Sequence, residues 1–564
     1  MIRRKVILCT VVLSLGGCAV QDAAPVTAAC SVIDGTPWVP TVAGAGDCNH
    51  TDTGMSVTEL VASVSNAPLT GLSDAINANA RTITVTFDLS SVAFKSSGSL
   101  ALTAEMTSFP SSVLAGSAWP VLVSLHDGTN ELVGMETGCA GGMFSCSGGT
   151  CSPRAGCEPD PAGTAGSAYL GSSAPLRRES WDYHNTAVFS GMSVNTFPTC
   201  SWSSGSPTCS FLSAPGNFSS GLAGGVKLRS GTYTAKYVLL TDHYSSVGAT
   251  RLGSFQVTAA AKSDGNEGTA NGCDSTSGHK GAVDVNVVLV GDQNVIDSHT
   301  DKGKQNLNAL FQHVYDQLST SNATTVGIRL GKITVYEWSC EAGGEGYANV
   351  EDYYQMFQTG SSLLPAETSG KALNVFLTST IGGNTAYLGL SGGLSGPPKN
   401  GTTGSGLVFA SFNKLSNFNA SCLGTGACAV TDQDFDFIDM GGTISHEIGH
   451  YLGLNHLSER EGTEHDPVPD SPECNFKFPT SYGIGVNSCR SVSNTSVYAP
   501  TGLTCSQACA SYNGTTSFCP NALECQFNHV MWYTTKNYGS GGTGDGNHFS
   551  TYSGDILNLH PLVR

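Results

Sequence analysis

The residue types best suited to chemistry are concentrated in one short stretch, "SHEIGHYLGLNH" at residues 445–456. If this stretch is helical, His446 and His450 lie on one face about a turn apart, so both imidazoles can bind one metal ion. Glu447 follows the first histidine and lies to the side of that metal. It is poorly placed as a ligand but well placed to reach a water molecule bound to the metal. The spacing therefore predicts a metal site with an acid–base group beside it.

A third ligand follows the expected end of this helix. Gly453 is the residue type that most readily adopts the left-handed conformation with which helices end. The chain can then turn and present His456 to the same metal. Three neutral imidazoles with an open fourth position are typical of catalytic zinc rather than of a closed structural site. The alternative is a helix with incidental surface histidines, and a glycine and a third histidine at these offsets count strongly against it.

The motif "HEIGHYLGLNH" matches every defined position of the signature H-E-x-x-H-x-x-G-x-x-H, so the chain resembles the metzincin zinc endopeptidases. The resemblance covers about residues 280–564 and includes "FNHVMWYT", which looks like the Met-turn of that family. It implies that Met531 supports the ligand histidines from below and that Tyr533 approaches the metal or the transition-state oxygen. Ordinary core packing is the alternative for both residues. Trp532 departs from the family pattern because it is bulkier than expected there.

An acidic segment follows the histidine motif. "EHDPVPDSPEC", residues 464–474, resembles the proline-containing segment of pappalysin-like metzincins, in which some carboxylates contribute to calcium binding. The resemblance implies that Asp466, Asp470 and Glu473 are candidate oxygen ligands for Ca²⁺. The alternative is a solvated acidic loop held by Cys474.

The activity that the resemblance implies is hydrolysis of peptide bonds in extracellular proteins. Zinc held by the three histidines would activate a water and polarise the scissile carbonyl. Glu447 would serve as the general base and Tyr533 would hydrogen-bond the oxyanion. We expect "SGLVFAS", residues 405–411, to form an edge strand that pairs with extended substrate. The competing hypothesis is a surface adhesin or binding lipoprotein with a structural or vestigial metal site, and Glu447 argues against it because such a site needs no carboxylate there.

The elements around the motif indicate an α/β domain with a small mixed sheet. The nearly continuous apolar run at 283–291 suits a strand covered on both faces. A helical pattern follows, with apolar residues at Leu307, Leu310, Phe311, Val314 and Leu318. Further strands are expected at 332–338, 372–377 and 406–411, before the histidine-rich helix. From Asp466 onward the sequence predicts a Cys-rich subdomain dominated by loops.

The region from about residue 50 to 258 has a different pattern, typical of β structure. "TITVTFDL" at 82–89 alternates apolar and polar residues, and 120–125 and 232–240 also read as strands. Turn-rich segments separate them, so the sequence predicts a sandwich-like antiparallel fold.

The N-terminus indicates export. "MIRRKVILCTVVLSLGGCAV" has a basic start and an apolar run that is too short to span a membrane permanently. Its segment Leu15 to Cys18 resembles a bacterial lipobox, which implies lipidation of Cys18; an ordinary secretory signal is the alternative. We expect an envelope lipoprotein, in the outer membrane if the host is Gram-negative, or an extracellular protein.

Cysteine usage and charge agree with export. Of the 20 cysteines, Cys9 lies in the signal and Cys18 is reserved for lipid, which leaves an even number to form disulfides. Their spacing lacks the repeated C-x-x-C pairs of a zinc ribbon. The net charge of −18 disfavours a nucleic acid partner. The expected partners are extended polypeptide substrate and, through Cys18, a membrane.

The expected organisation is that of a multidomain protein. A β-rich region that is either an accessory domain or a prosegment precedes the metzincin-like domain. The segments are a lipoprotein-type signal at 1–17, a tether at 18–48, the β-rich region at 49–260, a linker at 261–272, and the catalytic domain at 273–564.

Overall fold

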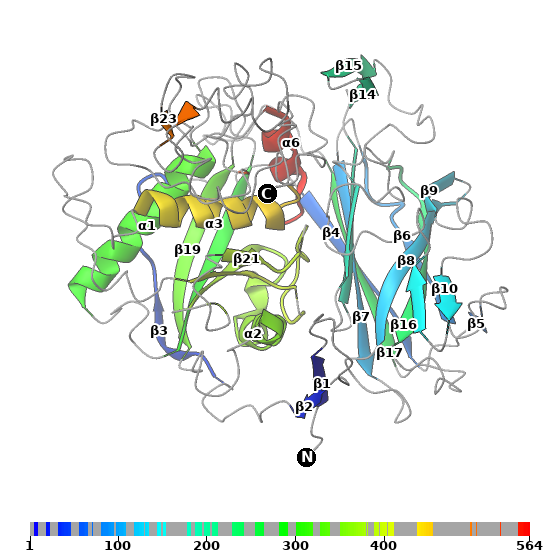
Figure 1. The fold of residues 1–564 in the computed structure, drawn as a ribbon, viewed down its shortest axis with the longest axis horizontal. Helices are drawn as coiled ribbons and strands as arrows, with labels where there is room; N and C mark the ends of the chain where they lie inside the picture. The colour runs from blue at the N-terminus through cyan, green and yellow to red at the C-terminus, as the bar shows by residue number, and fades with distance from the viewer. Residues whose placement is uncertain are drawn as a thin grey trace.

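Figure 1 shows two bodies side by side, a β-rich one and a mixed α/β one. This computed structural model describes residues 5–8, 19–22, 32–46, 56–65, 70–71, 81–94, 98–108, 118–128, 130–134, 144–147, 150–153, 177–181, 186–193, 197–203, 206–212, 228–241, 254–263, 281–291, 300–319, 328–338, 350–378, 381, 389–393, 395–402, 404–410, 437–454, 497–498, 503–504, 531 and 551–564. Within them, no helix is long and apolar enough to cross a membrane.

The α/β body contains a mixed sheet of six described strands in the order β21-β22-β20-β18-β19-β3. Strands β18, β19, β20 and β22 run parallel, whereas β21 and β3 are antiparallel to their neighbours. The strands are β3 (Asp34–Trp38), β18 (Ala282–Val290), β19 (Arg329–Trp338), β20 (Ala372–Thr378), β21 (Gly389–Ser391) and β22 (Leu407–Ala410). The apolar run of β18 lies inside the sheet, as its composition predicts, because both of its faces are covered.

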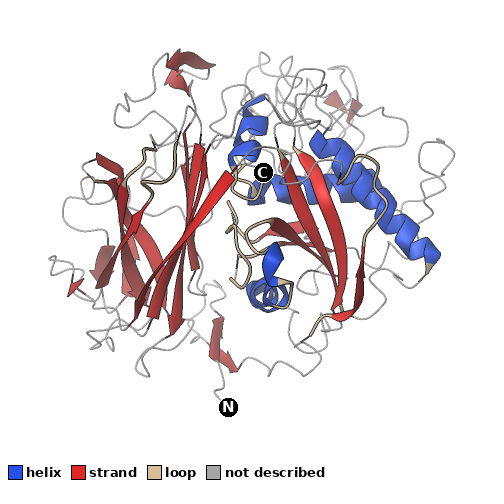
Figure 2. Cartoon of the chain, turned by 180° about the vertical axis from the view of Figure 1, so that it is seen from behind, coloured by secondary structure: helices blue, strands red, loops and turns tan. Residues whose placement is uncertain are grey.

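Helices cover both faces of this mixed sheet (Figure 2). One face shares a core with α1 (Asp301–Ser319) and α3 (Phe437–Tyr451), and the other packs against α2 (Val350–Ser362). The chain closes with α6 (Thr551–Leu559), which packs in the same core as α3. Thr300 caps α1, because its hydroxyl oxygen accepts a hydrogen bond from the Gly303 N–H at 3.0 Å. The five apolar residues that predicted this helix are all buried.

The β-rich body consists of two antiparallel sheets around one hydrophobic core. The first sheet has the strand order β12-β13-β7-β17-β4 and is called the β7 sheet below. The second sheet has the strand order β5-β6-β16-β8-β9 and is called the β16 sheet below. Their bounds are β4 (Ser56–Ser65), β5 (Thr70–Gly71), β6 (Arg81–Asp88), β7 (Gly98–Ser108), β8 (Ala118–Asp127), β9 (Asn130–Gly134), β12 (Arg177–Trp181), β13 (Thr186–Ser193), β16 (Thr232–Thr241) and β17 (Ser254–Ser263). The three strand segments predicted in this region coincide with β6, β8 and β16.

Four short antiparallel hairpins complete the described strands. They are β1 (Lys5–Leu8) with β2 (Ala19–Asp22), β10 (Phe144–Ser147) with β11 (Thr150–Pro153), β14 (Phe197–Ser203) with β15 (Ser206–Leu212), and β23 (Val497–Tyr498) with β24 (Leu503–Thr504). Two hairpins place cysteines directly opposite each other, Cys146 with Cys151 and Cys200 with Cys209.

Part of the expected tether belongs to the α/β body, which corrects the prediction for residues 32–46. β3 pairs with β19 and thereby extends the mixed sheet. The following residues run along α1, where the Thr41 N–H donates to Asn308 Oδ1 at 2.9 Å and the Ala43 N–H to Gln312 Oε1 at 2.6 Å. The backbone N–H groups that follow β3 thus have hydrogen-bond partners on α1, so this segment is held against the α/β body.

The expected linker also begins later than residue 261. Strand β17 continues to Ser263, and both Ala261 and Lys262 are buried. The polar, glycine-rich character of residues 261–272 suggested a loop, but Ala261 and Lys262 pair with β7 and β4 on either side. Residues 264–280 lie outside the described part of the chain.

Candidate active site

Helix α3 carries the histidine motif, and its apolar residues fix which way the histidines face. Met440, Ile444 and Ile448 recur every four residues and are buried in the core shared with α1. His446 and His450 therefore lie on another face of the helix, away from this apolar stripe. The spacing of the apolar residues within α3 thus determines that the two histidines face away from the core shared with α1.

The two histidines fit a metal site. Their ring centroids are 4.6 Å apart and the rings meet edge to face, at 88°. His450 Nδ1 lies 2.8 Å from the Leu454 carbonyl oxygen. That carbonyl can only accept, so Nδ1 carries the proton and Nε2 is left with the lone pair that binds a metal. A carbonyl that holds the other ring nitrogen is the usual support of a zinc-binding histidine.

The helix ends as the sequence predicts, at Gly453. This residue has φ +110°, a conformation that favours glycine. Its N–H donates to the His450 carbonyl at 2.9 Å, and the Leu454 N–H donates to the Gly449 carbonyl at 2.9 Å. This pair of bonds is a Schellman motif, which satisfies the last carbonyls of the helix. It also places the Leu454 carbonyl beside His450.

Glu447 lies between α3 and strand β21. Its carboxylate accepts a hydrogen bond from the Ser391 N–H, and a Cβ at Gly389 would stand only 2.6 Å from Glu447 Cγ. Glycine at that position therefore lets the strand approach the carboxylate closely. Burial raises the pKa of Glu447 to about 8 in the protein without metal, although the Ser391 hydrogen bond acts in the opposite direction. The carboxyl group is held in a site that water reaches poorly.

Strand β21, rather than the predicted segment, is the edge strand next to the site. The segment 405–411 contributes β22, which pairs with β20 on one side and β21 on the other. The prediction of an edge strand there is wrong because β21 pairs along the side of β22 that would otherwise be the edge. The signal for β21 was weak, since a strand of three residues that includes Gly389 has almost no periodicity.

Met531 lies against the histidine helix. It is buried in the same core as Ile444 and Ile448. A Cβ at Gly449 would collide with its sulfur, so the glycine between Ile448 and His450 makes room for the methionine. A supporting position below the histidines is thus occupied by a soft, adaptable side chain.

The end of α3 is also held by a loop that sequence reasoning did not single out. The Tyr451 hydroxyl donates to the Pro397 carbonyl at 2.8 Å, and the Gly396 N–H donates to the Tyr451 carbonyl at 2.7 Å. Gly396 packs directly on the tyrosine ring, where a Cβ would not fit. The segment 395–402 therefore positions the last turn of the histidine helix.

The remaining predicted site residues lie outside the described part of the chain. They are His456, Tyr533 and Trp532 near the expected zinc site, Asp466, Asp470 and Glu473 of the candidate calcium site, and Cys18. The structure brings together His446, His450, Glu447 and Met531, and for the others the sequence-based predictions stand as they were made.

Residues 358–512 match the family model described as Metallo-peptidase family M12B Reprolysin-like. The match includes β20, β22 and the whole of α3 with its histidine motif, and it ends before Met531. A search of curated proteins found no match for the chain. The chain thus contains a metallopeptidase domain of the metzincin type. The protein is a zinc metalloendopeptidase, and its substrate is polypeptide.

Proposed function

We propose that this protein is an exported, lipid-anchored endopeptidase of the cell envelope, in which Glu447 is the general base. The observation that carries the proposal is the position of the Glu447 carboxylate. It is buried beside the histidine pair and held by the Ser391 N–H of the edge strand. A purely structural metal site has no use for a carboxylate enclosed in this way.

Each predicted residue has a chemical task in this proposal. His446, His450 and His456 would hold zinc, which when bound polarises the scissile carbonyl and makes a water acidic. Glu447 takes the proton of the attacking water and passes it to the leaving amine. Tyr533 donates a hydrogen bond to the developing oxyanion. Met531 keeps the histidine helix in place from below.

The substrate is bound in an extended conformation. β21 is an edge strand in the described sheet, with its pairing partner β22 on one side only. The free edge of such a strand presents backbone groups to an added strand. Because Glu447 contacts β21 at Gly389 and Ser391, a peptide paired with this strand passes close to the carboxylate.

The anchor and the disulfides rest on different observations. Cys18 follows a lipobox-like segment, and removing its thiol in Cys18→Ala should abolish lipid labelling and release the protein from membranes. The facing cysteines of the two hairpins support disulfides Cys146–Cys151 and Cys200–Cys209, since opposed residues of antiparallel strands have Cα separations that fit the bond. Peptide mapping of the unreduced protein would show other pairings if this proposal were wrong.

The acidic segment supports membership of the pappalysin-like group with bound calcium. Asp466, Asp470 and Glu473 supply the oxygen ligands that Ca²⁺ prefers. Removing calcium while zinc stays saturating should lower the melting temperature, because a ligand of the folded state stabilises it. An unchanged melting curve would leave the segment as a solvated loop. The N-terminal body serves as a sandwich-like accessory domain.

Two variants test the general base. Glu447→Gln should keep its zinc but lose about two to four orders of magnitude in cleavage of an unstructured protein. His450→Ala should lose both zinc and activity, because one ligand is missing. Glu367→Gln, at an exposed glutamate of the same domain, is the matched control. Zinc content by elemental analysis is measured beside cleavage. Full activity in Glu447→Gln would refute the mechanism, and a wild type that binds zinc but cleaves nothing would favour the binding lipoprotein.

A further inference from the structure

Part of the outward face of the β7 sheet, over β7 and β17, is buried, although the sheet already covers its own core with the other face. In β7 and β17 the inward residues, such as Leu102 and Val257, pack between the two sheets. Six outward residues of these two strands are also at most 6% exposed, namely Ser99, Ala101, Thr103, Thr258, Ala260 and Lys262. The outward face of an antiparallel sheet in a separate domain is normally polar and solvated. This face instead consists mostly of small side chains under a close cover.

The cover is provided in part by the last residues of the chain. The Lys262 ammonium contacts the carbonyl oxygens of Asn558 and Val563 and lies 3.5 Å from that of His560. The Ser99 hydroxyl donates to the Leu559 carbonyl. The carbonyls at the end of a helix lack partners within the helix and carry partial negative charge. A buried lysine of β17 therefore supplies the cation at the end of α6.

The same C-terminal segment is built into the catalytic body. The Arg564 N–H donates to the Ala282 carbonyl at 2.8 Å, and the Ala282 N–H donates back to the Arg564 carbonyl at 2.7 Å. Leu557, Leu562 and Val563 lie in the core that contains α3 and β18. Residues 557–564 are thus held by both bodies, between which Figure 1 places α6.

Side chains cross between the bodies at two more places. Arg564 Nη2 donates to the Gly370 carbonyl at 2.6 Å and lies 3.4 Å from Glu59 Oε1 of β4. Lys399 forms an ion pair with Glu105 of β7, and its Nζ lies 3.5 Å from Thr258 Oγ1 of β17. Both members of the Lys399–Glu105 pair are mostly buried, so solvent screens it little.

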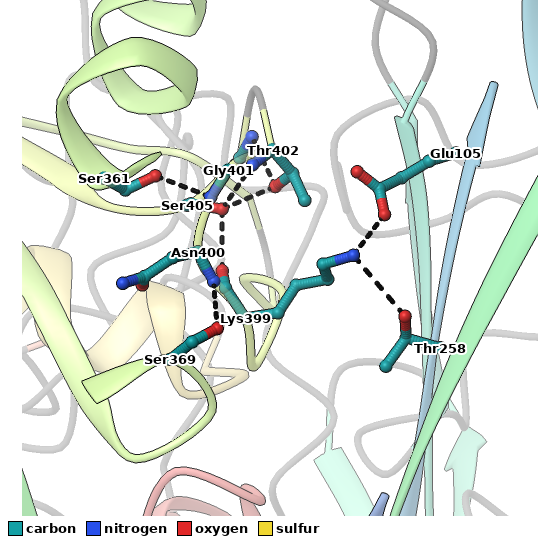
Figure 3. A network of polar contacts seen from close by, with 10 residues as sticks. Glu105, Thr258, Ser361, Ser369, Lys399, Asn400, Gly401, Thr402 and Ser405 are labelled. Carbon is teal, nitrogen blue, oxygen red and sulfur yellow. Dashed lines mark hydrogen bonds and ion pairs between the residues drawn. The ribbon is translucent and has the colours of Figure 1, made fainter. Parts of the chain in front are cut away.

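The loop that presents Lys399 is itself fixed from several sides (Figure 3). Ser405 Oγ donates to the Lys399 carbonyl at 2.7 Å, and the Asn400 N–H donates to Ser369 Oγ at 3.0 Å. The Gly401 N–H donates to Ser361 Oγ at 2.8 Å. This is the loop whose residues 396 and 397 hold Tyr451 at the end of α3. The ion pair to β7 therefore ends on a loop that positions the histidine helix.

From these contacts we propose that residues 56–263 are a permanent half of the enzyme and not a prosegment that is removed on activation. The C-terminal segment 557–564 joins the two bodies, and loop 395–402 connects the β7 sheet to the active-site helix. Release of the N-terminal body would expose the buried outward residues of β7 and β17. It would also leave the carbonyls around residue 560 without the Lys262 ammonium.

The test cuts the chain without removing either half. Recognition sites for a specific protease are inserted between residues 46 and 56 and in place of residues 266–271 in the full-length protein, and the purified protein is cut while folded. The first cut is needed because β3 pairs with β19 in the catalytic body and would otherwise hold the pieces together by itself. The two pieces that carry the β-rich body and the catalytic body should co-elute in size-exclusion chromatography, with no rise in peptide cleavage after the cuts. Denaturing electrophoresis without reductant shows whether a disulfide joins them, which would itself be a permanent attachment. Pieces that separate in native buffer, or an activity that rises on separation, would overturn the proposal. Co-elution is read without reference to activity, so it is independent of the proposed general base.

A matched pair of variants identifies the responsible contact. In the cut protein, Lys262→Met keeps the apolar stem but removes the ammonium, and should raise the dissociation constant of the two pieces at least about tenfold. Arg229→Met removes a cation that pairs with Asp127 at 2.6 Å within the N-terminal body, and should leave the dissociation constant unchanged. Equal behaviour of the two variants would refute the role of Lys262.

Discussion

The two sheets of the N-terminal body share one core but differ on their outward faces. In β6 of the β16 sheet, buried Ile83, Val85 and Phe87 alternate with exposed threonines, as expected for a sheet with one solvated face. In the second half of β17 the alternation stops, and residues 257–262 are all buried. Among the described residues, the outward face is therefore covered over β7 and β17 and solvated over β6. The cover belongs to the catalytic body, which reaches β7 and β17 through the C-terminal segment.

The largest expected effect comes from a charge placed on the covered outward face of the β7 sheet. Ala260→Glu inserts a carboxylate where the β7 sheet is covered, and should lower the free energy of unfolding by about 3–5 kcal/mol. Thr86→Glu makes the corresponding change on the exposed face of β6 and should cost less than about 0.5 kcal/mol. Urea unfolding of both variants measures the difference. If Ala260→Glu is tolerated as well as Thr86→Glu, the two faces are equivalent and the comparison fails.

A smaller effect is expected from pH, through His560 in the covering segment. Its Nδ1 accepts the Leu562 N–H at 3.2 Å and its Nε2 lies 3.1 Å from the Gly396 carbonyl, so the neutral ring is satisfied on both sides. Burial lowers the pKa of His560 to about 3; the Lys262 ammonium adds to this shift and the Gly396 hydrogen bond opposes it. The unfolded chain therefore takes up a proton at a higher pH than the folded chain. Stability should fall by about 2 kcal/mol from pH 6.5 to 5.

Unfolding of wild type and His560→Gln at several pH values measures this dependence. The groups facing His560 are Lys262 and the Tyr451 ring, whose centroid is 6.1 Å away, and neither takes up a proton in this range. His560→Gln should therefore have a flatter pH dependence than wild type. An unchanged slope in His560→Gln would show that the covering segment does not control acid stability.

The smallest expected effect is that of the ion pair between the bodies. Lys399→Glu and Glu105→Lys each place like charges together, and each should lower stability by about 1 kcal/mol, whereas the double variant should recover most of the loss. Reversing the charges of the Arg229–Asp127 pair in the same way measures the coupling free energy of an ion pair within one body, for comparison. Peptide cleavage by the two single variants shows whether the loop transmits the change to α3. No recovery in the double variant would mean that the pair contributes no coupling.

Many elements of both bodies could be predicted because their signals are local. The alternation around Ile83 and the spacing from Leu307 to Leu318 each determine one element and the face that it buries. What could not be predicted depends on partners far away in the chain. Asp34–Trp38 lies in the segment predicted as a tether, but it pairs with β19. Lys262 lies in the segment predicted as a linker, but it is buried between the strands of the β7 sheet and the end of α6. Neither segment has a periodicity from which its partner could be predicted.

The sequence by itself determined the chemistry of the histidine helix. The four-residue spacing of His446 and His450, the intervening Glu447 and the terminal Gly453 act within about two turns of helix, where backbone geometry leaves little choice. Two features are visible only in the tertiary structure: β21 is the edge strand beside Glu447, and residues 557–564 join the two bodies. Sheet order and docking depend on which distant segments bury each other's apolar faces and satisfy each other's backbone groups. That pairing is a property of the whole chain, because no single segment carries both of the surfaces that meet.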